Sequence, residues 1–313
     1  MKFITKIKTS EMILIISILY SFIMGIGLFG FGTDYHTSYY KPNYNPSEWS
    51  KDFLGWKIST FTIFNYNIGV YLTSFILAFS TGKLIFFFLN LNRVSSIFIF
   101  FVIYLIEIFT WPIFQSTSNA MRQGLTMSFF NLSICALMKN ENRKSIIYII
   151  LAFFSHTSGP FVFFIYCLSR LYNLFLIKKN FLFLWVISLF IFSILFFYLS
   201  NGNYEKNRII GYDFGLAFLL INIFMVFFLS YNIKYITNNI FYLISFFVSF
   251  ISPSLFFLDM FWQYERINMI FLITHILVFG SLYKKKQTIF IWFIGFLFLL
   301  FLTYETGMYA SFK

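Results

Sequence analysis

Charged residues are scarce in this chain, and that scarcity excludes most classes of soluble protein. Asp, Glu, Lys and Arg make up 11 % of its 313 residues, against roughly a quarter in soluble domains. Apolar residues make up 59 %, and they recur in stretches close to the ~20 residues that cross a ~30 Å hydrocarbon layer. A soluble enzyme, a disordered protein and a nucleic-acid-binding module are therefore excluded.

Cysteines and the usual nucleotide and metal motifs are few or absent. Cys135 and Cys167 lie in apolar stretches, with no CxxC neighbour and no His at metal-ligand spacing. The chain has no Walker loop and no HExxH, and its one GxGxxG match, from Gly25 to Gly30, has no strand before it. We interpret these glycines as a helix contact and expect no disulfide, metal or cofactor.

Apolar runs separated by charged residues predict an all-α, polytopic membrane protein with about eleven transmembrane helices (ten to twelve) in a single domain, 1–313. The basic start and the run from Met12 to Phe31 lack an Ala-x-Ala-like cleavage site and predict a retained first helix. The predicted spans are 12–31, 66–89, 95–113, 119–138, 145–156, 160–177, 181–199, 214–231, 240–258, 267–283 and 288–303.

Lys and Arg fall unevenly between alternate connections, fifteen on one side and eight on the other. The positive-inside rule places the richer side, with the N terminus, in the cytoplasm, where anionic lipid headgroups account for the net charge of +12. The longest extracytoplasmic connection is 32–65, which is rich in Tyr and Trp and contains Pro42 and Pro46. We therefore expect any reaction chamber to open outward.

The strongest polar cluster runs from Gln115 to Thr126. Continued as one helix, this segment places five polar residues on one face, a stripe that must contact protein or water rather than lipid. The alternative is that the arginine is a snorkelling anchor, but amides and hydroxyls flank it instead of an apolar belt. The five residues are Ser116, Asn119, Arg122, Gln123 and Thr126.

A second polar cluster lies in the outer connection from Asp259 to Asn268. Asp259, Trp262 and Arg266 are predicted to share a helical face, with Gln263 beside them. An arginine there suits a diphosphate, because its planar fork of donors matches phosphate oxygens. An ion pair of Arg266 with Asp259 or Glu265 that closes the loop is an equal alternative.

The third cluster is Ser155-His156-Thr157-Ser158-Gly159-Pro160. The stretch 145–155 reaches only about 16 Å as a helix, whereas 161–178 reaches roughly 25 Å. We therefore predict a hairpin whose apex is recessed below the outer surface, where irregular backbone is tolerated only if it lines a cavity or is buried in protein. His156 at that apex is a candidate proton acceptor, and the alternative is a His that hydrogen-bonds the turn.

Weaker candidates complete the set. Glu107 is an intramembrane carboxylate, which is a functional candidate by default, and the alternative is a protonated or paired structural residue. Asp34 and His36 open the first outer loop, whereas Arg208 and Asp213 are equally consistent with solvated loop residues. For His275, in the middle of a span, a packing role is favoured.

The order of these features resembles the EpsG/Wzy-like family of bacterial polysaccharide polymerases. The matching stretches are an Asp- and Tyr-rich first outer loop at 34–54, an Arg-Gln helix start followed by a basic turn and a His-x-Ser turn at 119–160, and an aromatic Glu-Arg segment at 264–268. The resemblance implies a multi-pass, GT-C-like glycosyltransferase of the bacterial inner membrane, independent of metal and nucleotide. Such enzymes act in O-antigen, lipopolysaccharide, capsule and exopolysaccharide synthesis.

The reaction implied by this resemblance moves a growing glycan from undecaprenyl diphosphate onto an incoming lipid-linked repeat unit at the outer face. Its partners would be the undecaprenyl-diphosphate-linked oligosaccharide, the lipid bilayer and a chain-length regulator protein. Arg122 and Arg266 fit the family's arginines, and His156 fits the His of its His-x-Ser turn.

Residue chemistry agrees with that reaction. Cations stabilise a departing diphosphate, and a base must take the proton of the acceptor hydroxyl. We expect the diphosphate to be bound by Arg122, Arg266, Gln123 and Asn119. His156 and Asp34 compete for the role of base, and further contacts are expected from Glu107, Tyr264, Glu265 and Arg208.

Two other functions fit a chain of this kind. A lipid-linked oligosaccharide flippase, or another transporter, should carry polar residues on both sides of its cavity and often shows internal repeats. Here the polar residues gather on the outer side and no repeat is evident.

A membrane O-acyltransferase acting on polysaccharide draws its acyl donor from the cytoplasm and would place its essential His near the inner face. The depth of His156 therefore separates an O-acyltransferase from a polymerase.

Overall fold

The computed structural model describes residues 2–29, 53–64, 66–94, 96–118, 120–175, 186–191, 193–194, 215–232, 239–283 and 285–305. Within these ranges the regular secondary structure is helical apart from one short antiparallel pair, β1 (Thr62–Ile63) and β2 (Tyr66–Asn67). The predicted all-α fold is confirmed there, whereas most of the predicted span 181–199 and of the loop 32–65 lies outside the described residues.

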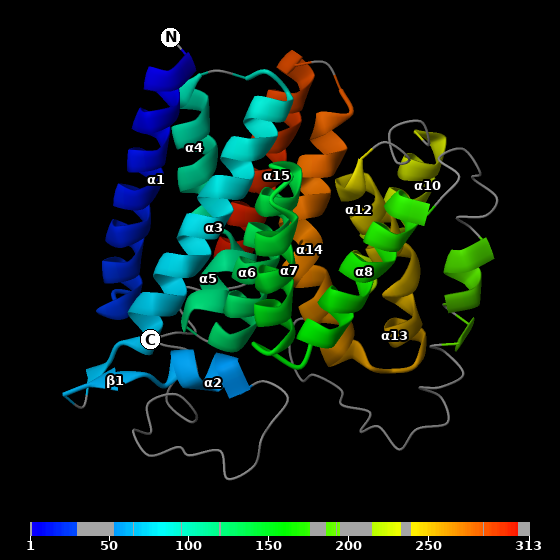
Figure 1. Ribbon diagram of the computed structural model, residues 1–313, viewed down its shortest axis with the longest axis horizontal. Helices are drawn as coiled ribbons and strands as arrows, with labels where there is room; N and C mark the ends of the chain where they lie inside the picture. Colours follow the sequence, from blue (N-terminus) through cyan, green and yellow to red (C-terminus); the bar gives the residue numbers. More distant parts are fainter. Residues whose placement is uncertain are drawn as a thin grey trace. The chain divides into compact units, whose positions relative to one another are not determined.

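Figure 1 shows the helices of the described part of the chain. They are α1 (Lys2–Gly25), α2 (Phe53–Ser59), α3 (Gly69–Leu91), α4 (Ile97–Ile108), α5 (Trp111–Ser118), α6 (Met121–Met138), α7 (Asn142–Phe153), α8 (Gly159–Phe175), α10 (Gly215–Tyr231), α12 (Ile240–Ile251), α13 (Pro253–Phe257), α14 (Phe261–Ser281) and α15 (Lys285–Glu305).

The chain divides into two compact units. Unit 1 comprises residues 1–160 and 283–313, and unit 2 comprises residues 161–282. In unit 1, α3 packs against α1 and α6, α6 packs against α7, and α15 returns from the end of the chain to pack on α4 and α5. In unit 2, α10, α12 and α14 pack against one another. The prediction of one transmembrane domain stays a prediction.

Helices in unit 1 approach closely where a glycine faces an aromatic ring. A Cβ at Gly82 would lie 2.8 Å from the Tyr104 ring, and the hydroxyl of Tyr104 donates to the carbonyl of Ala78 at 2.9 Å. A Cβ at Gly25 would likewise collide with the ring of Tyr71. Small residues at such contacts are typical of helix pairs in membranes. The interpretation of Gly25 as a helix-contact residue is therefore confirmed.

Several helices have the length and composition of membrane spans. Among the described residues these are α3, the α12–α13 segment Ile240–Phe257 and the segment Gln287–Tyr304 of α15, with the bent pair α4–α5 as a fourth. Large apolar side chains are exposed, such as Phe22 (58 %), Phe227 (68 %) and Phe290 (64 %), as lipid contact requires. A membrane protein is supported, whereas eleven spans and a cytoplasmic N terminus stay predictions.

The predicted span 95–113 is not a single straight helix, because α4 and α5 meet at an angle of 58°. Pro112 has no backbone N–H to donate to the carbonyl of Ile108, which interrupts the helical hydrogen bonds there. The Thr110 hydroxyl instead donates to the carbonyl of Glu107 at 2.7 Å. After this break the chain continues as α5, which packs on α6.

Candidate functional site

The polar segment 115–126 forms two helices, so the predicted single polar face is wrong. The N–H of Ala120 donates to the carbonyl of Gln115 at 2.9 Å, a bond that ends α5, and α6 begins at Met121. Helix α5 packs back onto α6, where a Cβ at Gly124 would collide with the Ser116 carbonyl oxygen. Ser116 therefore belongs to α5, while Arg122, Gln123 and Thr126 belong to α6.

Arg122 lies in the first turn of α6 and is stacked on an aromatic ring. Its guanidinium carbon is 3.8 Å from the centre of the Trp56 ring of α2. Trp56 is itself buried against Val70 and Met121. The packed indole fixes the plane of the guanidinium and therefore the directions of its N–H donors. A snorkelling arginine side chain has no such constraint. Arg122 is half-buried, so part of the side chain is accessible.

The start of α6 adds to the positive potential around Arg122. Its N-cap residue, Ala120, offers no side-chain hydrogen bond to the first turn. The N–H groups of the first helical turn have no acceptor within the helix, and the helix dipole places partial positive charge at this end. Arg122 and the helix start together favour an anion.

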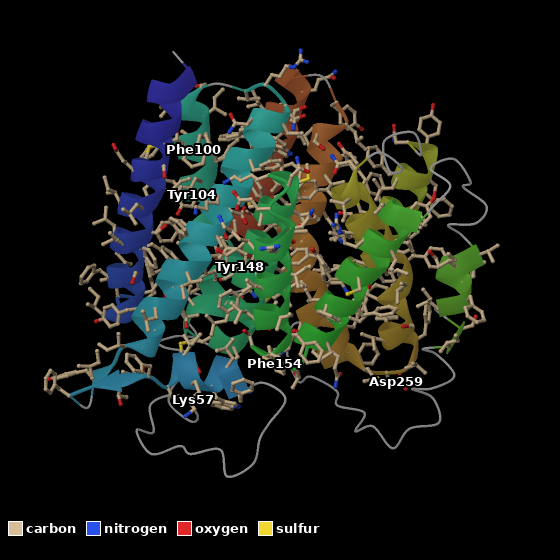
Figure 2. All side chains as sticks on the ribbon, in the orientation of Figure 1. Lys57, Phe100, Tyr104, Tyr148, Phe154 and Asp259 are labelled. Carbon is tan, nitrogen blue, oxygen red and sulfur yellow. The ribbon has the colours of Figure 1, made fainter. Side chains whose placement is uncertain are left out.

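Helix α2 joins Arg122 to the turn that carries His156. The N–H of Leu54 donates to the carbonyl of Phe154 at 3.1 Å. A Cβ at Gly55 would collide with the Ser155 carbonyl oxygen and lie 3.0 Å from Cγ of Arg122. In Figure 2, Lys57 of α2 and Phe154 lie at the same end of unit 1, away from Phe100 and Tyr104. Only a glycine allows α2 to approach both groups so closely.

The turn between α7 and α8 buries His156 and holds its ring from one side. The ring is 3 % exposed. The N–H of Ser158 donates to Nδ1 of His156 at 3.2 Å, and Oγ of Ser158 lies 2.8 Å from the same nitrogen. Because a backbone N–H only donates, Nδ1 is an acceptor, and the neutral ring carries its proton on Nε2. The predicted turn between the two helices is present, whereas the hairpin and its depth in the membrane stay predictions.

Further buried polar residues lie on α4 and α6. Thr126 donates to the carbonyl of Ala152, at the end of α7, at 3.3 Å. Gln123 is buried, and Glu107 is fully buried at the break after α4. Oε1 of Glu107 lies 3.5 Å from the Thr110 hydroxyl, and its Oε2 has no hydrogen-bond partner among the described residues. A lone carboxyl oxygen in such a place fits a protonated structural group or a proton-handling group.

In unit 2, the predicted shared face of Asp259, Trp262 and Arg266 is wrong, because Asp259 lies outside the helix. It adopts a left-handed conformation (φ 59°), and α14 begins at Phe261. The N–H of Met260 donates to the carbonyl of Leu255 at 2.9 Å, the bond that closes such a helix end. Arg266 and Glu265 lie within α14 and are half-buried.

Tyr264 and Asn268, one turn apart on α14, form a buried network with α10. Nδ2 of Asn222 donates to the hydroxyl of Tyr264 and to Oδ1 of Asn268, both at 2.8 Å, and lies 3.2 Å from the Ser252 hydroxyl. Tyr264 is fully buried. Its hydroxyl accepts a hydrogen bond that holds α14 against α10.

Other sequence predictions have mixed outcomes. Asp34, His36, Asn119, Arg208 and Asp213 lie outside the described residues. His275 is buried with Nε2 3.5 Å from the Ser249 hydroxyl, in agreement with a packing role. Both cysteines are free, and among the described residues no three His, Cys, Asp or Glu side chains are placed to hold a metal ion.

Sequence reasoning missed Trp56 and Gly55. Trp56 directly follows Gly55 in the first predicted outer loop, and this Gly-Trp pair was the signal in the sequence that could have indicated both residues. Its partners lie far along the chain, at Arg122 and Ser155, so no local pattern indicates the contact.

Comparisons with known proteins identify a family. No curated protein and no solved structure matches the chain significantly. The family model described as the EpsG family matches residues 12–312, a range that contains both arginines, the His156 turn and helix α2. Since this match covers essentially the whole sequence, the chain belongs to the EpsG family.

Proposed function

We propose that this protein polymerises lipid-linked polysaccharide repeat units at the outer face of a bacterial inner membrane. Membership of the EpsG family points to a polysaccharide polymerase in general. In the proposed reaction, a hydroxyl oxygen of the acceptor repeat unit forms a bond with the anomeric carbon of the donor chain. The bond between that carbon and undecaprenyl diphosphate breaks, the diphosphate leaves with the electron pair, and a base takes the hydroxyl proton.

The observation that carries this proposal is the stacking of Arg122 on Trp56 at the start of α6. A departing diphosphate gains negative charge, so it is stabilised by donors whose orientation is already fixed. The guanidinium supplies a planar fork for phosphate oxygens, and the helix start adds partial positive charge. Removing one such group typically costs about 10²–10³-fold in rate. A donor that arrives already linked to lipid needs no nucleotide.

The partners in this proposal are those implied by the family. The substrates are undecaprenyl-diphosphate-linked oligosaccharides embedded in the bilayer, and a chain-length regulator protein is the expected protein partner. The product is a surface polysaccharide of the O-antigen, capsule or exopolysaccharide kind.

Variants of Arg122 test the proposal in cells. We expect Arg122→Ala to abolish long chains, and Arg122→Lys to rescue poorly because lysine keeps the charge but loses the planar fork. Because flipping belongs to another protein in this scheme, the surface should carry single repeat units instead of a ladder of lengths on a gel. Arg266→Ala, in unit 2, tests the second predicted arginine in the same way.

The matched control is Arg143→Ala, an exposed arginine on the predicted cytoplasmic side, which should keep the ladder. If Arg122→Ala still gave a wild-type ladder of chain lengths, Arg122 would serve only as a membrane anchor and would have no role in polymerisation. An empty surface would favour the flippase alternative, because a transport defect strands repeat units inside the cell.

A further inference from the structure

We propose that three lysines at the turn between α6 and α7 form a binding site for the phosphate of an anionic phospholipid. They are Lys83 on α3, Lys139 at the end of α6 and Lys144 in the first turn of α7, and we call them the basic cluster. All three belong to unit 1 and to the predicted cytoplasmic side. Arg122 and Lys139 lie at opposite ends of α6, so this site is separate from the proposed reaction site and does not rest on the polymerase function.

Lys83 is a charged residue inside a helix that has the length and composition of a membrane span. It is half-buried, and its Nζ lies 4.1 Å from the centre of the Phe79 ring, one turn earlier on α3. Within the described part of the chain, no hydrogen bond or ion pair of this ammonium is present. An aromatic face offsets only part of the cost of taking an ammonium out of water, and an intramembrane charge therefore calls for a further partner.

The neighbours of Lys83 are basic as well. The charges of Lys139, Lys144 and Glu141 act on the Lys83 ammonium, which places these side chains together near the end of α6. Glu141, the acid among them, is paired with Lys144 at 3.0 Å. Lys139 and Lys144 are exposed. One carboxylate among three ammonium groups leaves an excess of positive charge, so the further partner of Lys83 is an anion.

The position of the basic cluster along the helices favours a lipid as the source of that anion. At 1.5 Å per residue, α3 is about 34 Å long and α7 only about 18 Å. Figure 1 shows α3 continuing past the start of α7, and the residues of α3 that follow Lys83, from Leu84 to Leu89, are all apolar. A soluble acidic protein would have to enter the membrane to reach Lys83, whereas a short span draws lipid headgroups inward by thinning the bilayer.

A phosphodiester headgroup that carries no cation matches this site. Lysine ammonium groups are compact charges with rotatable donors, so they bind a phosphate in more than one orientation. A zwitterionic headgroup brings its own ammonium close to the lysines, and this like-charge contact weakens its binding. After Lys144, helix α7 exposes Ile146, Ile147 and Ile150, which the acyl chains of the same lipid can cover.

Lipid titrations of the full-length protein in neutral detergent test this site. Native mass spectrometry counts the lipids that the protein retains, and titration with phosphatidylglycerol or phosphatidylcholine gives a dissociation constant for each. We expect one phosphatidylglycerol to bind at least about tenfold more tightly than phosphatidylcholine. Lys83→Met and Lys139→Met each remove a charge but keep an unbranched apolar side chain, and each should weaken phosphatidylglycerol binding about fivefold.

The matched control is Arg93→Met. Arg93 is exposed just after α3 on the same predicted side, but its charge is not among those that act on Lys83. This variant should bind phosphatidylglycerol within about twofold of wild type, because salt screens an exposed charge at a distance. Lys139 is exposed at a turn, so Lys139→Met should fold even if Lys83→Met, on a packed helix, does not.

Unchanged affinity in Lys83→Met and Lys139→Met, or equal affinity of the wild type for the two lipids, would overturn the inference. An equal loss in Arg93→Met and the cluster variants would reduce the site to diffuse surface charge. Displacement of the phospholipid by inorganic phosphate would identify a soluble anion as the ligand instead, and tighter binding of undecaprenyl phosphate through the same lysines would identify the carrier lipid. None of these results bears on the polymerase function, which elongation tests separately.

Discussion

The contact between Arg122 and Trp56 shows how one neighbouring side chain changes the role inferred for a residue. An arginine near the end of a predicted span is often an anchor, with its charge in water. Here a buried indole lies 3.8 Å from the guanidinium carbon and limits its orientation. Cation–π contacts of this kind contribute about 0.5–2 kcal/mol, which is enough to keep a side chain in one rotamer.

The residue-scale prediction concerns Trp56. Trp56→Leu keeps an apolar side chain in the buried position but removes the aromatic face, so elongation should fall by roughly 2- to 30-fold, in proportion to the lost cation–π energy. Trp56→Phe should lose less. Combining Trp56→Leu with Arg122→Lys should add little to the loss from Arg122→Lys alone, because both changes remove the same oriented guanidinium. Full additivity in this double-mutant cycle would contradict a functional stack.

At the scale of elements, α2 organises the site by covering the turn between α7 and α8. The helix has seven residues, which is too short to be stable in isolation, so tertiary contacts must hold it. Those contacts are the Leu54–Phe154 hydrogen bond, the close approach at Gly55 and the burial of Trp56.

Gly55→Ala tests the docking of α2. The added methyl group would collide with the Ser155 carbonyl oxygen, so α2 must shift away from both the turn and Arg122. We expect elongation to fall at least tenfold, with a loss of about 1–3 kcal/mol in the free energy of unfolding, as for overpacking elsewhere. Lys57→Ala on the same helix is the control, because Lys57 is exposed. Equal activity in the two variants would contradict this role for α2.

Most elements could be predicted from the sequence, but the end of α5 and the contacts between distant segments could not. Apolar runs separated by charges indicate helices, and α3, α6 and α10 lie close to their predicted ranges. The bend after α4 has a signal in the sequence, Pro112. The end of α5 depends on a backbone hydrogen bond that a polar stripe does not reveal, so the sequence predicts one helix over 115–126 where the structure has two. The contact of Gly55 with Ser155 joins segments a hundred residues apart and has no local signature.

At the scale of the whole molecule, the prediction that matters most is the side of the membrane on which the His156 turn opens. Thr157 is exposed although its neighbours His156 and Ser158 are buried, so it is a suitable reporter position. The positive-inside rule places this turn outside and the exposed Lys144, at the start of α7, inside.

Cysteine labelling tests that orientation. In a background where Cys135 and Cys167 are replaced by alanine, Thr157→Cys should react with a small impermeant thiol reagent added to intact cells whose outer surface is accessible. Lys144→Cys should react only after the membrane is opened. The reverse pattern would contradict the topology and favour an enzyme that works from the cytoplasmic face, such as an O-acyltransferase.

The most direct test of polymerase function is reconstitution of the purified protein in vesicles with an undecaprenyl-diphosphate-linked repeat unit as the sole glycan substrate. With a metal chelator present and no sugar nucleotide, the vesicles should accumulate a ladder of lipid-linked chains and one undecaprenyl diphosphate for each new glycosidic bond. Arg122→Ala protein should yield neither product. Repeat units that cross the bilayer without growing longer would contradict the polymerase function and identify a transporter.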